Sequence, residues 1–93
     1  MSQAKHDTGK PKIGLVPPAI LEAVAHVRMF GVEKYKDPEN WRVVDREQYE
    51  HALLRHLCEW MRDKSSVDVE SGLPHLWHVA CNVAFILEME RTR

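Results

Sequence analysis

Residues 68–90 read DVESGLPHLWHVACNVAFILEME, and this stretch decides the fold. Gly72 and Pro74 predict a helix start, because a proline in the first turn gives up only an amide that has no helical partner. The helix that follows has two faces with little charged surface. The first face comprises Leu76, Val79, Ala80, Val83, Ile86 and Leu87, an ordinary core pattern, and the second comprises His75, His78, Asn82, Phe85 and Met89.

A helix with so little plainly solvated surface is expected to be buried on several sides. Two neighbouring helices cannot surround a third one well. The pattern therefore predicts an all-α fold with three main helices, forming a helical bundle completed by oligomerisation. We expect a homo-oligomer, either a dimer or a higher even-numbered assembly.

The other two helices follow from local signals. A Pro-Pro pair at residues 17–18 predicts the start of the first helix, whose apolar stripe runs to Phe30 with room for one more turn. Asp-Pro-Glu-Asn at residues 37–40 is typical of a turn. The second helix is predicted to begin near Asp45, with Gln48 three residues later as in a capping box.

The chain has 93 residues, the size of one domain. Residues 1–12 are polar and lack periodicity, which predicts a flexible N-terminal arm and leaves residues 13–93 as a single all-α domain. A formal net charge of -1 argues against an extended nucleic-acid or anionic-membrane surface.

Targeting signals are weak in this sequence. No apolar run reaches the roughly 20 residues of a membrane helix, and the polar N-terminus lacks the apolar core of a secretion signal. We therefore expect a cytoplasmic protein in which Cys58 and Cys81 are buried free thiols.

Four side chains around the start of the third helix have the chemistry of a metal site. Asp68 and Glu70 precede the helix, and His75 and His78 project from one side of its first turn. Neutral imidazoles ligate transition metals, and carboxylates add oxygen ligands. The alternative is that both histidines satisfy backbone or carboxylate partners while Ser71 caps the helix.

His56 borders the apolar arc of the second helix, where an antiparallel third helix would bring His75 or His78 close to it. It is a candidate third ligand, a general base or a group that orients another ligand. An ordinary histidine at the edge of the core is the alternative. Arg55 is a candidate phosphate clamp, or simply an ion-pair partner of Glu59.

Lys34, Asn40 and Trp41 flank the turn after the first helix. A lysine for phosphate, an asparagine for a base edge and an aromatic ring for stacking suit a nucleotide pocket. Singly, an aromatic residue such as Trp41 is more typical of a core or an interface. Asn82 shares the face of the two histidines and is a further candidate for substrate contact.

Taken in order, these residues resemble the phage-borne dATP/dGTP diphosphohydrolase N-terminal family. The resemblance covers about residues 11–90 and rests on Phe30-Gly31, Lys34-Tyr35, Asn40-Trp41, Leu54-Arg55-His56-Leu57, Asp68, Glu70-Ser71-Gly72-Leu73-Pro74-His75-Leu76, His78 and Asn82. The family looks like a relative of the MazG-type all-α nucleoside triphosphate pyrophosphohydrolases. The resemblance implies cleavage of a purine deoxynucleoside triphosphate to monophosphate and pyrophosphate, with Mg²⁺ or Mn²⁺ as the divalent metal.

The resemblance also implies roles for individual residues. It suggests catalytic roles for His56, Asp68 and Glu70, metal ligation by Asp68, Glu70, His75 and His78, and nucleotide contacts from Lys34, Asn40, Trp41, Arg55 and Asn82. The wider MazG-type signature pairs Glu-x-x-Glu on one helix with Glu-x-x-Asp on a later one. Glu47 and Glu50 imitate the first pair, but Glu59 and Asp63 are four residues apart, so its metal ligands do not transfer to this chain.

Two functions from different classes follow from these observations. The first is metal-dependent pyrophosphohydrolysis of a purine (deoxy)nucleotide. The alternative is a non-catalytic nucleotide-binding protein, which in a phage would act as a sponge for a nucleotide signal. A purely structural helical module leaves the histidine and carboxylate cluster unexplained. If His75 and His78 are ligands, their unperturbed pKa of about 6.5 predicts that metal affinity falls below about pH 6.

Overall fold

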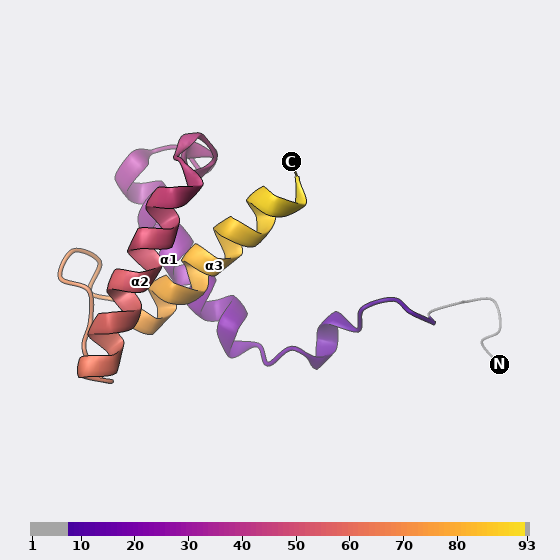
Figure 1. The fold of residues 1–93 in the computed structure, drawn as a ribbon, viewed down its shortest axis with the longest axis horizontal. Helices are drawn as coiled ribbons and strands as arrows, with labels where there is room; N and C mark the ends of the chain where they lie inside the picture. Colours follow the sequence, from indigo (N-terminus) through magenta and orange to yellow (C-terminus); the bar gives the residue numbers. More distant parts are fainter. Residues whose placement is uncertain (1–7, 93) are drawn as a thin grey trace.

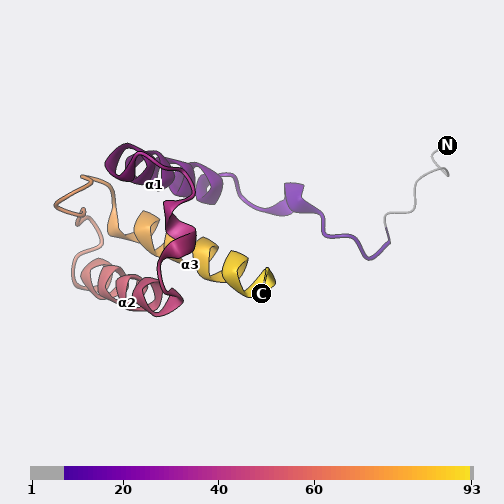
Figure 2. The same ribbon diagram turned by 90° about the horizontal axis from the view of Figure 1, so that it is seen from above.

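The computed structural model describes residues 8–92, and this part of the chain is all-helical, as predicted. Its elements are η1 (Ile13–Leu15), α1 (Ala19–Tyr35), η2 (Asn40–Val43), α2 (Arg46–Arg62) and α3 (His75–Arg91), where η denotes a 3-10 turn. α3 lies between α1 and α2 and packs against both (Figure 2). The segment before α1 extends away from the three helices (Figure 1).

The helix boundaries follow local backbone chemistry. α1 begins after Pro18 and continues through the predicted extra turn to Lys36, where a left-handed φ of 58° ends the helix. The Lys36 N–H donates to the Val32 carbonyl oxygen at 2.7 Å. α2 begins after Asp45 as predicted, but the capping box is wrong, since the Asp45 side chain makes no capping hydrogen bond. The Gln48 amide donates instead to the Asp45 backbone carbonyl oxygen, at 3.0 Å.

Of the two faces of α3 that were expected to be buried, the single chain buries the one that carries the histidines. The buried side chains of α3 are His75, His78, Cys81 and Asn82. On the predicted core face, Leu76, Val83 and Leu87 are 41%, 39% and 61% exposed. The physical reason is that α1 and α2 both cover the histidine side of α3, so no described element of this chain covers the other side. Leu76, Val83 and Leu87 therefore do not form a core within the single chain, and their burial by a second subunit stays a prediction.

The apolar core is small. Among the described residues, its buried members are Ala23, Val27 and Cys81. Both cysteines are free, but Cys58 is exposed, so the prediction that both thiols are buried is wrong for Cys58. Cys81 is buried because it lies on the side of α3 that the other two helices cover.

The N-terminal prediction is only partly within the described chain. Residues 8–12 form no helix or strand, and residues 1–7 lie outside the described residues. The division into an arm of residues 1–12 and a domain of residues 13–93 stays a prediction. None of the helices described here combines the length and apolar character that a bilayer crossing requires.

Candidate metal and nucleotide site

The connector between α2 and α3 is shaped by Asp68. Its N–H donates to the Leu73 carbonyl oxygen, and its own carbonyl accepts the Gly72 N–H, both at 2.8 Å. Its side-chain Oδ2 accepts the N–H groups of Glu70 and Ser71, at 3.1 and 2.9 Å. Gly72 closes the loop at a φ of 73°, which glycine adopts without a steric penalty. These bonds hold the carboxylate of Asp68 at the start of α3.

Three imidazoles meet beside this carboxylate. His56 of α2 and His75 of α3 share a hydrogen bond between their Nδ1 atoms, 2.8 Å apart, in which one ring donates and the other accepts. His78 stacks on His56, with ring centroids 4.5 Å apart and planes at 11°. The Nε2 atom of His78 lies 2.7 Å from Ser71 Oγ. Ser71 therefore orients His78, and α3 has no side-chain cap.

Three residues bring their ligand atoms close enough to hold a metal ion. His56, Asp68 and His75 each offer one such atom, and these atoms lie within 4.8 Å of one another. Two imidazole nitrogens and one carboxylate oxygen fit a divalent transition metal and leave coordination positions for water or phosphate. Glu70 and His78 lie beside this group rather than in it, and their ligand roles stay predictions.

The protonation states of these groups favour metal binding. Burial, helped by the neighbouring His78, lowers the pKa of His56 to about 4. Burial also lowers the pKa of His78, against an opposing effect of Asp68. Burial alone would raise the pKa of Asp68, but the Ser71 amide and His78 outweigh it, so this pKa lies below its ordinary value. His56 and His78 therefore present neutral nitrogens and Asp68 presents an ionised oxygen, the forms that ligate metals.

A cavity of about 360 Å³ lies beside the cluster and is lined by residues of α1, η2, α2, the connector and α3. Trp41 stacks on Phe85 in its lining, with centroids 4.7 Å apart and planes at 11°. Tyr49 lies against the same Phe85 ring and donates its hydroxyl to the Trp41 carbonyl oxygen at 2.8 Å. The size and the aromatic lining suit a small-molecule ligand with a flat ring.

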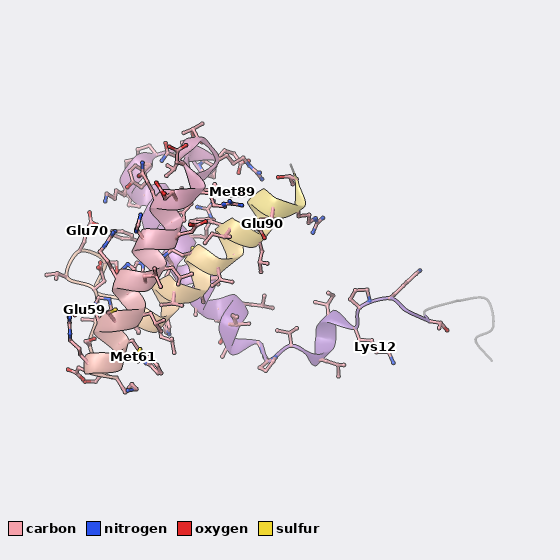
Figure 3. The ribbon with its side chains drawn as sticks, in the orientation of Figure 1. Lys12, Glu59, Met61, Glu70, Met89 and Glu90 are labelled. Atoms are coloured by element: carbon pink, nitrogen blue, oxygen red, sulfur yellow. The ribbon has the colours of Figure 1, made fainter. Side chains whose placement is uncertain are left out.

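The predicted substrate residues come from four elements yet line this one cavity. Lys34 of α1 forms an ion pair with Glu70 of the connector, with Nζ and Oε2 2.6 Å apart. Figure 3 shows Glu70 on that connector. Asn82 is buried and donates through Nδ2 to the His78 carbonyl oxygen at 2.8 Å. The complete set of predicted substrate residues in the lining is Lys34, Asn40, Trp41, Arg55 and Asn82.

Two of the acidic residues compared with the MazG-type signature form ion pairs with arginines of their own helix. Glu50 pairs with Arg46 at 3.1 Å, and Glu59 pairs with Arg62 at 2.9 Å. Because Glu59 is bonded to Arg62, the simple ion pair that the sequence offered for Arg55 does not form among the described residues. Arg55 lines the cavity instead.

The residues of the cavity wall that sequence reasoning did not predict include Arg28, Tyr49 and Phe85. Tyr49 and Phe85 fit the apolar faces of their helices and therefore resembled core residues. Arg28 places its guanidinium carbon 5.4 Å from the centroid of the Phe85 ring and donates a hydrogen bond to the Pro38 carbonyl oxygen. The sequence feature that points to Arg28 is its charge at a position directly after Val27, a buried residue of α1.

The sequence of the whole chain, residues 1–93, matches the family described as dATP/dGTP diphosphohydrolase, N-terminal. No curated protein and no solved structure matches the chain. The family match agrees with the resemblance carried by the residues that line the cavity and the histidine cluster.

Proposed function

Because the chain belongs to the dATP/dGTP diphosphohydrolase N-terminal family, we propose that it is a metal-dependent pyrophosphohydrolase. Its substrates are purine (deoxy)nucleoside triphosphates, and its products are the monophosphate and pyrophosphate. One observation carries this proposal: His56 and Asp68, two of the three clustered ligands, line the same cavity as the stacked pair Trp41 and Phe85. An aromatic surface suited to stacking on a base and a group suited to binding a metal thus line one cavity.

His56, Asp68 and His75 are the residues that would hold a divalent metal, and their two imidazole nitrogens suit Mn²⁺ better than Mg²⁺. When bound, such an ion neutralises phosphate charge and lowers the pKa of a water molecule. The lowered pKa of His56 suits a ligand better than a general base. We therefore assign proton acceptance to Glu70, whose carboxylate lies next to the cluster in sequence and lines the cavity.

Lys34 and Glu70 form an ion pair with each other, and both side chains also line the cavity in which the nucleotide would bind. The two side chains are 37% and 58% exposed, so the pair is well solvated and contributes little stability. A triphosphate competes with Glu70 for the Lys34 ammonium, which leaves the Glu70 carboxylate free to face water. Arg55 lines the same cavity and offers a planar fork for a second phosphate.

We expect Trp41→Ala to weaken nucleotide binding by about 5- to 150-fold, because stacking on an aromatic side chain contributes roughly 1–3 kcal/mol per base. Calorimetric titration with dGTP measures this affinity. Ca²⁺ replaces the catalytic metal in this experiment, because it supports catalysis poorly and the nucleotide therefore stays intact. Trp60→Ala is the matched control, since Trp60 lies on α2 beneath Lys64 and outside the cavity lining. Equal affinities for the Trp41 variant and the unchanged protein would contradict the stacking role.

The decisive test of the reaction is incubation with each deoxynucleoside triphosphate and Mg²⁺ or Mn²⁺, followed by chromatography. We expect monophosphate and pyrophosphate from dATP or dGTP, and their loss in His75→Ala. His26→Ala should keep the activity, because His26 is exposed on α1 and stacks on Trp77 rather than joining the cluster. Absence of turnover with every nucleotide would refute the enzymatic proposal.

The alternative function is a nucleotide-binding protein without catalysis, which in a phage would sequester a nucleotide signal. One observation favours it: the three-residue cluster contains a single carboxylate, where the MazG-type signature has two acidic pairs. In that case the ligand comes back intact after denaturation, and binding survives EDTA. Recovery of hydrolysed ligand would exclude this alternative.

We also propose that the protein acts as a homo-oligomer in the cytoplasm, which is the host cytoplasm if a phage encodes it. The small buried core and the exposed apolar face of α3 support the oligomer.

A further inference from the structure

A second cavity lies against the histidine cluster. It has a volume of about 700 Å³, and its lining includes all three clustered ligand residues, His56, Asp68 and His75. His56 and Asp68, together with Arg55, also line the cavity that contains Trp41, which we call the aromatic cavity. The two cavities therefore border on the same candidate metal group, so the base and the phosphates of one nucleotide can lie in different cavities.

The second cavity differs from the aromatic cavity in its chemistry. No tryptophan, tyrosine or phenylalanine is among the described residues that line it, so it offers no large aromatic ring for stacking on a base. Two arginines, Arg55 and Arg62, line it instead. The guanidinium group presents several N–H donors in a planar fork, which matches the oxygens of a phosphate group. The second cavity is therefore suited to an anion rather than to a base.

The basic side chains of this cavity come from one face of α2. His51, Arg55 and Arg62 are separated by four and seven residues, spacings that keep side chains on the same side of a helix. Figure 3 shows Glu59 of the same face and Glu70 on the connector that follows α2. A polar helix face is ordinarily just a solvated surface. Here the connector and the start of α3 border it and supply two of the clustered ligands, so the face becomes one wall of a cavity.

The charge of the second cavity depends on the metal. Glu59 and Asp68 are in the lining, and these two carboxylates balance the formal charge of the two arginines. A divalent ion at the cluster would therefore leave positive charge in excess. Arg62 donates to both carboxylate oxygens of Glu59, at 2.9 and 3.2 Å, but the Arg62 side chain is 74% exposed. Such a solvated pair contributes little stability, so an anion can replace Glu59 as the partner of Arg62.

We propose that the second cavity binds inorganic pyrophosphate, with Arg55 and Arg62 as its charged donors. The identity of the anion rests on the proposed function, in which the base and its monophosphate stay together and the other two phosphates leave as one product. When a nucleoside triphosphate is bound, the same cavity holds its β- and γ-phosphates. Base binding and phosphate binding are thus divided between two cavities, with the cluster at their boundary.

Cys58 reports whether this cavity is occupied. It lines the cavity and is exposed, whereas Cys81 is buried, so N-ethylmaleimide should modify Cys58 alone in the folded protein. With Mn²⁺ present throughout, we expect saturating inorganic pyrophosphate to slow this modification, followed by mass spectrometry, at least about tenfold. Deoxyguanosine monophosphate should leave the rate unchanged, because it binds in the aromatic cavity. Pyrophosphate in EDTA should protect Cys58 only weakly, since the positive charge is then no longer in excess.

Two substitutions should change the affinity for pyrophosphate in opposite directions. Arg62→Gln removes a charged donor, so the half-protecting concentration should rise about tenfold. Glu59→Gln removes a negative charge and frees Arg62, so this concentration should fall about threefold. A purely structural role of the ion pair would move both variants in the same direction. Lys64→Gln is the matched control, because Lys64 carries the same charge but lies over the Trp60 ring, outside the cavity lining.

The outcomes separate this proposal from the proposed function. Lack of protection by pyrophosphate, in a protein that still hydrolyses dATP or dGTP, would overturn the second cavity as the phosphate site and leave the enzymatic function standing. Protection by pyrophosphate without hydrolysis of any nucleotide would support the anion site and refute only the enzymatic function. Equal protection by deoxyguanosine monophosphate, or an unchanged half-protecting concentration in Arg62→Gln, would also overturn the proposal.

Discussion

Asp68→Asn should weaken Mn²⁺ binding by about 10- to 100-fold or more while leaving the fold almost unchanged, since loss of even an outer-shell partner at a metal site commonly costs 10–100-fold. Asparagine keeps an oxygen that can accept the N–H groups of Glu70 and Ser71, so the connector retains its shape. It removes the negative charge that the cluster contributes to the metal. Calorimetric Mn²⁺ titration and a thermal melt measure the two effects separately.

Asp68→Ala should show both losses. Without the side-chain oxygen, the two N–H groups lose their charged acceptor, and hydrogen bonds to charged groups contribute about 1.5–3 kcal/mol in favourable settings. Asp63→Asn is the control for the substitution itself, because Asp63 accepts the N–H and the hydroxyl of Ser65 in the same connector but lies outside the cluster. Mn²⁺ affinity that is unchanged in Asp68→Asn would remove this carboxylate from the metal site.

The metal-free protein should lose stability as the pH falls from about 6.5 towards 4. Burial and the neighbouring His78 lower the pKa of folded His56 to about 4, whereas the unfolded chain takes up this proton near pH 6.5. Between these values the unfolded state binds more protons, so acidification lowers the free energy of unfolding. Because His56 is partly exposed, we expect an effect on the order of 1 kcal/mol rather than the full value.

Urea denaturation in EDTA, at several values from about pH 7.5 to about pH 4.5, measures this slope. His56→Gln should flatten it, and His26→Gln should leave it as it is. An unchanged slope in His56→Gln would show that His56 does not titrate as described. Because its pKa is lowered to about 4, His56 competes with protons for a metal only at a pH below the value near 6 that an unperturbed imidazole suggests.

The sequence by itself determined the helices and the side-chain types available to the candidate site. Pro18 and Pro74 precede α1 and α3 in the structure, as their loss of an amide predicts. Such helix boundaries are local effects, because they depend on a residue and its neighbours within one turn and not on what packs against the helix. The same is true of residue type: Asp68, His56 and His75 could be nominated as ligands because only a few side chains bind metals.

Only the tertiary structure decided which groups meet. His56 and His75 are 19 positions apart and touch because α2 packs on α3, and Lys34 reaches Glu70 because α1 covers the other flank. The structure also left one of the two expected faces of α3 exposed in the single chain, since helical spacing shows that Leu76, Val83 and Leu87 share a face but not what covers it. Periodicity is a property of one helix, whereas burial depends on the neighbours that pack against it, including a second copy of the chain.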